Sequence, residues 1–183
     1  MNLANKLTIF RIVLVPFFVT ALMADAIPHN IAIALGIFVI ASITDYLDGY
    51  IARSRNMITA FGKFFDPIAD KILVMAALVC FAGLNWVQSW TVIVILGRDF
   101  IVSAVRLAAV ESEEKIVIPA RMSGKVKTAV TMVVICGIMV LQSFDFNAWV
   151  GNIAMYVCVA LNLYSGGQYV YDSRKLFSEM TDS

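Results

Sequence analysis

The sequence has few charged residues. Asp, Glu, Lys and Arg make up only 15% of its 183 residues, whereas 61% are hydrophobic and the mean hydropathy is +0.84. Soluble domains contain about 25% charged residues and about 45–50% apolar residues. The shortage of charge therefore argues against a water-soluble globular protein.

Cysteine and histidine are also scarce. The three cysteines, Cys80, Cys136 and Cys158, each lie inside an apolar run, and their number is odd. We therefore expect neither a disulfide framework nor a cysteine metal site. The single histidine, His29, stands in a short turn beside Pro28, where we expect a solvated side chain rather than a ligand or a base.

Neither sign of charge dominates the sequence. The 14 Lys and Arg residues and the 13 Asp and Glu residues give a formal net charge of +1. Such a balance produces no overall field that would attract nucleic acid, so we expect no nucleic-acid partner. Any function that depends on charge must come from the local placement of charged residues.

Six apolar segments fill most of the chain. A bilayer core of about 30 Å needs roughly 20 helical residues, and each segment reaches or approaches that length. Because the segments are apolar on all sides, they fit helices better than the alternating strands of a barrel. We expect an all-α integral membrane protein, a single domain over residues 1–183 with six transmembrane helices. The segments span approximately residues 7–24, 30–53, 64–85, 89–110, 125–143 and 148–171.

The positions of the basic residues predict the orientation in the membrane. The connections around residues 25–29, 86–88 and 144–147 contain no Lys or Arg. The alternate connections and the two ends of the chain carry Lys6, Arg11, Arg53, Arg55, Lys63, Lys115, Arg121, Arg174 and Lys175. By the positive-inside rule, we expect both termini and the connections at 54–63 and 111–124 to be cytoplasmic.

Four aspartates lie inside the expected spans, where an unpaired charge costs about 2.5 to 3.5 kcal/mol per residue. Asp45 and Asp48 are three residues apart, and Asp66 and Asp70 are four apart, so each pair shares one face of a helix. The short connection between the two segments makes them antiparallel neighbours. We therefore expect the four carboxylates to form one cluster near the cytoplasmic face.

Four neighbouring carboxylates must be neutralised. Either some of them stay protonated or divalent cations bind, and an all-oxygen donor set suits Mg²⁺, Mn²⁺ or Ca²⁺ rather than zinc. Gly49, Ala52 and Gly62 leave room for the phosphates of a ligand, and Arg53 adds a cation. An alternative is a divalent-cation or proton transporter, although no acidic ladder continues through the last three segments.

These residues follow the pattern Asp45-x-x-Asp48-Gly49-x-x-Ala52-Arg53, then eight residues to Gly62, then x-x-x-Asp66-x-x-x-Asp70. The pattern resembles the signature of the CDP-alcohol phosphotransferases at every fixed position and in both spacings. The resemblance implies a six-helix membrane fold that is usually homodimeric. It also implies transfer of a phosphatidyl or similar group from a CDP-linked donor to an alcohol, with release of CMP.

The resemblance further implies roles for individual residues. It makes Asp45, Asp48 and Asp66 ligands of a divalent metal, Mg²⁺ or Mn²⁺. We expect two ions, as in other two-metal phosphoryl-transfer sites. Asp70 is either a further metal ligand or the catalytic base. The expected contacts of the CDP donor are Thr8, Gly49, Ala52, Arg53 and Gly62.

Other segments resemble the phosphatidylglycerophosphate synthases within that family. These segments are Asn5-Lys6-Leu7-Thr8 with Arg11, then Arg98-Asp99 through Arg106, then Ser123-Gly124-Lys125-Val126-Lys127-Thr128. Arg98 lies too deep in its segment to reach the interface easily, so it should face a polar cavity or a carboxylate. We expect the acceptor phosphate to be bound by Arg98, Arg106, Lys125 and Lys127. The alternative is that the terminal cations only anchor the helices at the membrane surface.

Together these features predict a metal-dependent phosphatidyltransferase of phospholipid biosynthesis. We expect CDP-diacylglycerol as donor and sn-glycerol 3-phosphate as acceptor, with phosphatidylglycerophosphate and CMP as products. Inositol phosphate is the alternative acceptor, because it too carries a phosphate. We expect membrane lipids and a second copy of the chain as partners, and a bacterial cytoplasmic membrane as the location, with the active site facing the cytoplasm.

Overall fold

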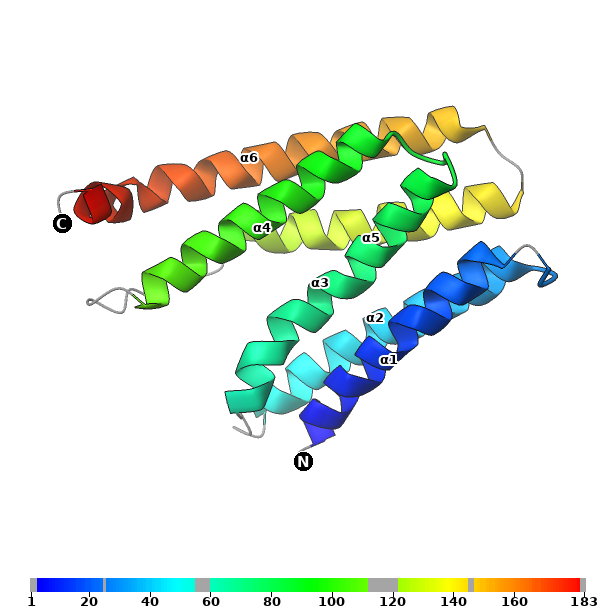
Figure 1. The fold of residues 1–183 in the computed structure, drawn as a ribbon, viewed down its shortest axis with the longest axis horizontal. Helices are drawn as coiled ribbons and strands as arrows, with labels where there is room; N and C mark the ends of the chain where they lie inside the picture. The colour runs from blue at the N-terminus through cyan, green and yellow to red at the C-terminus, as the bar shows by residue number, and fades with distance from the viewer. Residues whose placement is uncertain (1–2, 25, 55–59, 112–121, 145–146, 182–183) are drawn as a thin grey trace. The chain divides into compact units, whose positions relative to one another are not determined.

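The structure, a computed structural model, describes the backbone of residues 3–24, 26–54, 60–111, 122–144 and 147–181. It describes the side chains of residues 8–24, 26–44, 71–105, 124, 126–144, 147–169 and 171. The described residues form six helices and no strand, which confirms the all-α class (Figure 1). The helices are α1 (Leu3–Met23), α2 (Asn30–Ser54), α3 (Ala60–Gly83), α4 (Ser89–Glu111), α5 (Met122–Ser143) and α6 (Ala148–Thr181).

Each expected segment coincides with one helix, and the differences lie at the ends. The helix α3 begins at Ala60 rather than near residue 64, and α6 continues to Thr181 rather than ending near residue 171. The expected boundaries followed apolarity, which marks where a bilayer would end. Backbone hydrogen bonding continues beyond that point, because the polar stretch 172–181 contains no Gly or Pro that would stop a helix.

The chain divides into two compact units. Unit 1 contains Met1–Trp86 and Ile135–Ala148, and unit 2 contains Val87–Val134 and Trp149–Ser183. The helix α5 therefore contributes its first part to unit 2 and its second part to unit 1. We expected a single domain over residues 1–183. Whether the two units fold together is not decided by this division, so the single domain stays a prediction.

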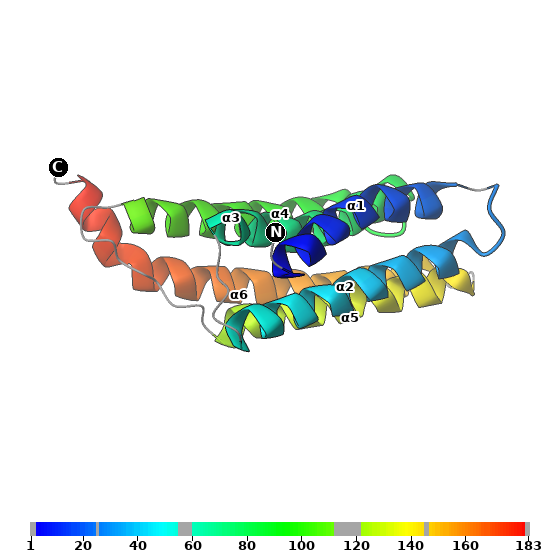
Figure 2. The ribbon, with the colours of Figure 1, turned by 90° about the horizontal axis from the view of Figure 1, so that it is seen from below.

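In unit 1, α1 and α2 form an antiparallel pair, and α1 also packs against α3 (Figures 1 and 2). The turn between α1 and α2 includes His29, whose φ is 57°. Asn30 closes the turn by donating from Nδ2 to the carbonyl oxygen of Leu22, at 3.3 Å. Further along the pair, the rings of Phe18 and Phe38 lie 5.8 Å apart at a tilt of 51°. Both rings are completely buried, so this contact is the centre of the α1–α2 packing.

The end of α3 is fixed by a left-handed residue and an aromatic contact. Asn85 has a φ of 58°, a conformation that Asn tolerates better than most side chains. The chain then turns back, so that the Trp86 N–H donates to the carbonyl oxygen of Phe81 at 2.9 Å. The rings of the same two residues lie 5.2 Å apart. The turn therefore closes on its own helix.

In unit 2, Gln88 ties the start of α4 to α6. Its Oε1 atom accepts hydrogen bonds from Trp90 Nε1 at 2.6 Å and from the Tyr156 hydroxyl at 2.9 Å. Its backbone N–H donates to Asn152 Oδ1 at 2.9 Å. The rings of Trp90 and Tyr156 stack with their centroids 5.7 Å apart. This cluster fixes which turns of α4 and α6 lie side by side.

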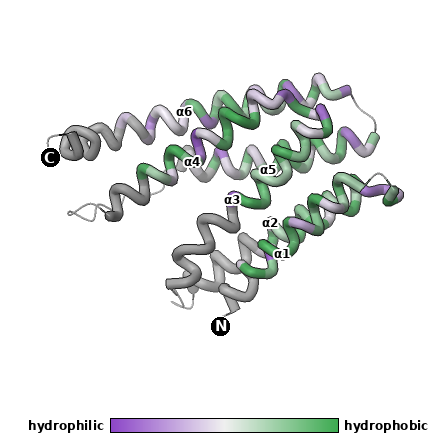
Figure 3. The backbone as a smooth tube through the Cα atoms, viewed as in Figure 1, coloured by the Kyte–Doolittle hydropathy of each residue, from purple (hydrophilic) through white to green (hydrophobic). Residues whose placement is uncertain are grey.

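Two described segments are long and apolar enough to cross a membrane, Val126–Ser143 and Ala148–Tyr169. Three shorter apolar helical stretches are Thr8–Met23, Asn30–Thr44 and Lys71–Gly83. Figure 3 shows mainly hydrophobic helices, with hydrophilic residues at several connections and in the middle of α4. The expectation of six spans with cytoplasmic termini stays a prediction.

The packing of α1 on α2 predicts different effects for two neighbouring phenylalanines. Phe18 is 0% exposed, whereas Phe17 is 59% exposed. Phe18→Ala should leave a cavity beside Phe38, and such a change costs about 3 to 5 kcal/mol in protein cores. Thermal unfolding of the purified protein in detergent should show a clearly lower Tm for Phe18→Ala and little change for Phe17→Ala. Equal Tm values for the two variants would contradict the described packing.

Candidate functional site

The expected donor and metal residues lie on two helices of unit 1. Asp45, Asp48, Gly49, Ala52 and Arg53 belong to α2, and Gly62, Asp66 and Asp70 belong to α3. The backbone therefore keeps the spacings of three and four residues within helices, as expected. The side chains of all eight residues lie outside the described residues, so the carboxylate cluster stays a prediction.

Two polar side chains on α1 are almost completely buried. They are Thr8, an expected contact of the donor, and Arg11, each 1% exposed. Both side chains take part in interactions, so neither is without a partner. A guanidinium persists in such a place only when its charge is compensated. The helix α1 packs against α2 and α3, the two helices that carry the aspartates.

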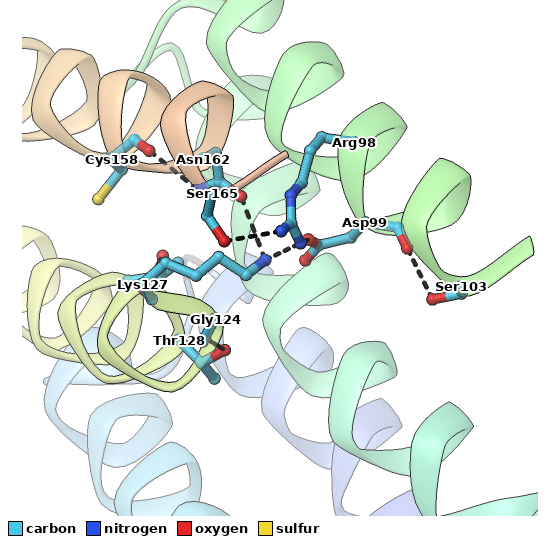
Figure 4. Close-up of polar contacts among 10 residues, drawn as sticks. Arg98, Asp99, Ser103, Gly124, Lys127, Thr128, Cys158, Asn162 and Ser165 are labelled. Atoms are coloured by element: carbon cyan, nitrogen blue, oxygen red, sulfur yellow. Dashed lines mark hydrogen bonds and ion pairs between the residues drawn. The ribbon is translucent and has the colours of Figure 1, made fainter. Parts of the chain in front are cut away.

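The described part of unit 2 contains a buried network of charged side chains, shown in Figure 4. Arg98 and Asp99 are neighbours on α4, and Arg98 Nη1 donates to Asp99 Oδ1 at 3.0 Å. Lys127, on α5, donates from Nζ to the same carboxylate oxygen. One oxygen of Asp99 therefore receives charge-assisted hydrogen bonds from two cations, which are stronger than neutral ones.

The helix α6 supplies a second partner for each cation. Arg98 Nη2 donates to Ser165 Oγ at 2.9 Å, and Lys127 Nζ donates to Asn162 Oδ1 at 3.1 Å. The amide of Asn162 is itself oriented, because its Nδ2 donates to the carbonyl oxygen of Cys158 at 2.9 Å. The network thus joins α4, α5 and α6 through polar contacts among buried or half-buried side chains.

Gly166 gives Arg98 the room that this geometry requires. A Cβ atom at Gly166 would lie 3.1 Å from Arg98 Cγ and 3.4 Å from Arg98 Nε. A methyl group would therefore press on the stem of the arginine. Among the described residues, none accepts a hydrogen bond from the buried Nε of Arg98. The Nε–H group of Arg98 is therefore a hydrogen-bond donor for which the described protein groups provide no acceptor.

Among the side chains that the structure describes here, two cations share one carboxylate. Arg98 and Lys127 are cations and Asp99 is the one carboxylate that joins them, so these three side chains leave one positive charge in excess. Their side chains are 12%, 9% and 21% exposed, respectively. A buried excess charge is costly, and such sites persist where a ligand, a cavity or a further partner compensates them. The arrangement suits an anionic ligand.

The structure brings together two of the four expected acceptor residues. Arg98 contacts a carboxylate, one of the two environments that its depth in α4 predicted, and Lys127 contacts the same carboxylate. Arg106 belongs to α4 and Lys125 to α5, and their side chains lie outside the described residues.

Sequence reasoning assigned no role to Asp99, Asn162 or Ser165. The sequence nevertheless contained a feature that could have drawn attention to each of these residues. Asp99 is an acidic residue next to a deep arginine, and Asn162 and Ser165 are polar residues three apart in an apolar helix. The contacts of Asp99 with Lys127, of Asn162 with Lys127 and of Ser165 with Arg98 could not be predicted, because they depend on how the helices pack.

Comparison with known proteins agrees with the sequence pattern. The chain matches the CDP-alcohol phosphatidyltransferase family over residues 1–164. It belongs to this family of membrane-lipid transferases.

Several curated relatives are similar along nearly their whole length. A CDP-diacylglycerol–glycerol-3-phosphate 3-phosphatidyltransferase of Bacillus subtilis is 37% identical, covering 92% of this chain and 93% of its own. An enzyme of the same name from Rickettsia felis is 38% identical, covering 96% and 97%. A probable phosphatidylglycerophosphate synthase of Mycobacterium tuberculosis is 40% identical, covering 92% and 80%.

The close approach at Gly166 predicts different effects for two adjacent glycines of α6. A Cβ atom at Gly167 would meet nothing within 4 Å, whereas one at Gly166 would press on Arg98. Gly→Ala within a helix gains about 1 kcal/mol in intrinsic propensity. Gly167→Ala should therefore keep or raise the Tm in detergent, and Gly166→Ala should have a lower Tm than Gly167→Ala. The described position of Arg98 is wrong if both variants gain stability equally.

Proposed function

We propose that this enzyme transfers the phosphatidyl group from CDP-diacylglycerol to sn-glycerol 3-phosphate. The products are phosphatidylglycerophosphate and CMP. The names of the relatives support this reading along most of the chain. The observation that carries the acceptor assignment is the buried pair of Arg98 and Lys127 around a single carboxylate.

An acceptor that carries a phosphate suits this network better than a neutral alcohol. A phosphate beside Arg98 and Lys127 would receive charge-assisted hydrogen bonds from both cations. Arginine is well suited to phosphate because its planar donors match two phosphate oxygens. A neutral alcohol would form no ion pair with either cation. In this proposal Arg106 and Lys125 bind the same phosphate.

The donor set of unit 1 fits divalent metal ions. Asp45, Asp48 and Asp66, with Asp70, offer only carboxylate oxygens from two helices, and Mg²⁺ and Mn²⁺ prefer oxygen ligands. When bound, such ions would neutralise the diphosphate and stabilise the CMP leaving group. Gly49, Ala52, Arg53, Gly62 and Thr8 would hold the cytidine diphosphate part of the donor.

Asp70 is the proposed base. The acceptor hydroxyl is a weak nucleophile at neutral pH, so a carboxylate within hydrogen-bond reach must take its proton as it attacks. The hydroxyl oxygen forms a bond to the β-phosphorus of the donor, and the bond from that phosphorus to the bridging oxygen breaks. CMP leaves with the bridging oxygen. The proton of the hydroxyl passes to the Asp70 carboxylate.

The location and assembly follow from the same reading. The donor's acyl chains remain in the bilayer, and its nucleotide enters from the cytoplasm of a bacterial cell. The six helices cross the cytoplasmic membrane with both termini inside, in line with the basic residues of the alternate connections. Two copies of the chain form a homodimer.

Release of CMP from CDP-diacylglycerol tests the proposed reaction. Detergent-solubilised protein should release CMP when sn-glycerol 3-phosphate is present, and only at background rates with glycerol or without an acceptor. The lipid product should be phosphatidylglycerophosphate by mass spectrometry. A preference for inositol phosphate would replace the acceptor assignment. CMP release with no acceptor-dependent lipid product would reject the transferase reaction.

Removal of metal and substitution of Asp70 test the proposed chemistry of unit 1. EDTA should abolish CMP release, and added Mg²⁺ or Mn²⁺ should restore it.

Asp70→Asn should lower kcat at least roughly a hundredfold, because a general base contributes that much. If Asp70 is only the base, this variant should still bind CDP-diacylglycerol with near-native affinity, whereas Asp66→Asn should bind it more weakly. Full activity in EDTA would contradict the metal proposal, and parallel loss of binding and turnover in Asp70→Asn would contradict its role as base.

Labelling of single cysteines tests the orientation. In a variant without the three native cysteines, Ser89→Cys should react with a membrane-impermeant thiol reagent in intact cells. Ser54→Cys should react only after the cells are opened, because the connection at 54–63 is proposed to be cytoplasmic. The opposite pattern would reverse the proposed topology.

A further inference from the structure

Asp99 lies at the centre of the network in unit 2, although its charge has the wrong sign for binding a phosphate. Its Oδ1 atom accepts from Arg98 Nη1 at 3.0 Å and from Lys127 Nζ. The two cations come from different helices, α4 and α5. This one oxygen is therefore what brings the guanidinium and the ammonium group together (Figure 4).

Each cation is also held at a second point, on α6. Ser165 accepts from Arg98, and Asn162 accepts from Lys127. Lys and Arg side chains are long, and ordering them during ligand binding costs entropy. In this network much of that ordering is already present before a ligand binds. The contacts with Ser165 and Asn162 restrict the conformations of the two side chains. Among the described residues of the network, however, only Asp99 contacts both Arg98 and Lys127.

We propose that Asp99 is a positioning residue for the acceptor. Its carboxylate holds Arg98 and Lys127 next to each other, so that both present positive charge to one phosphate group. Without the carboxylate, the positive charges of Arg98 and Lys127 would repel each other. They would turn apart, and the paired arrangement would have to be rebuilt for every acceptor molecule. The inference rests on the proposed function of these two cations.

Two other roles for Asp99 make different predictions. The carboxylate could serve only to join α4 to α5, in which case its loss would lower stability without a specific effect on the acceptor. It could instead compete with the acceptor phosphate for the cations, in which case its loss would tighten acceptor binding. Steady-state kinetics separates these roles from positioning.

Asp99→Asn is the central variant, because it keeps the shape of the side chain and removes its charge. We expect the KM for sn-glycerol 3-phosphate to rise roughly tenfold or more, the effect of losing charge-assisted hydrogen bonds. The KM for CDP-diacylglycerol and the kcat at saturating acceptor should change much less. Asp99→Glu keeps the charge one methylene further out, so its acceptor KM should lie between those of wild type and Asp99→Asn.

Thr128→Ala is the matched control. Thr128 follows Lys127 on α5, and its hydroxyl donates to the carbonyl oxygen of Gly124 at 3.1 Å within the same helix. This variant removes a hydrogen bond beside the network without touching the carboxylate. Its Tm and both KM values should match those of the wild type.

A double-mutant cycle tests whether Asp99 acts through Lys127. Lys127→Met removes one of the two positioned cations and should raise the acceptor KM by itself. If Asp99 works by positioning Lys127, Asp99→Asn should raise the acceptor KM by a smaller factor in the Lys127→Met background than in the wild type. Equal factors in the two backgrounds would contradict the coupling.

The acceptor KM of the Asp99 variants decides whether Asp99 is a positioning residue. An unchanged acceptor KM in a folded Asp99→Asn variant, or a lowered one, would overturn the positioning role. If Asp99→Asn fails to fold, Asp99→Glu decides: we expect a several-fold higher acceptor KM at a near-native Tm, and an unchanged KM would overturn the proposal. Failure of the wild type to use sn-glycerol 3-phosphate would instead reject the proposed function, so the two failures are distinguishable.

Discussion

A carboxylate oxygen shared by two largely buried cations is the interaction on which the described part of unit 2 depends. Asp99 receives hydrogen bonds from Arg98 and Lys127, and α6 supplies the second partners of both. Breaking such a group by removing one member is costly, because the remaining charges are left buried without compensation. The same contacts therefore restrict how α4, α5 and α6 can pack and also collect positive charge at one place. In the proposed function, stability and acceptor recognition depend on the same few side chains.

The chain separates its two chemical tasks along the sequence. In the proposed function, the aspartates of α2 and α3 provide oxygen ligands for a metal-bound diphosphate, and the cations of α4 and α5 provide donors for a second phosphate. The acidic residues of α2 and α3 outnumber the basic ones in the same stretch of the signature, and in the described network of unit 2 the one carboxylate, Asp99, is shared by two cations. A phosphatidyl transfer to a phosphorylated alcohol needs both kinds of site.

Sequence reasoning succeeded where one segment carries the information by itself. Apolar length located all six helices, and the aspartate pattern identified the family that the comparisons confirm. The depth of Arg98 in its segment predicted either a polar cavity or a carboxylate, and the structure shows a carboxylate partner. The start of α3 and the end of α6 were predicted incorrectly, because helical hydrogen bonding continues beyond the apolar part of each segment. Asn162 and Ser165 were missed for another reason: their contacts depend on the rotation of α6 against α4 and α5, which no single segment encodes.

The most direct test of the account is equilibrium binding of the acceptor to the purified protein. Titration calorimetry in detergent would compare sn-glycerol 3-phosphate with glycerol, for the wild type and for Lys127→Met. The account predicts saturable binding of sn-glycerol 3-phosphate to the wild type, no measurable binding of glycerol, and strong weakening in Lys127→Met. Equal binding of the two compounds, or undiminished binding of sn-glycerol 3-phosphate by Lys127→Met, would contradict the claim that this buried network recognises the acceptor phosphate.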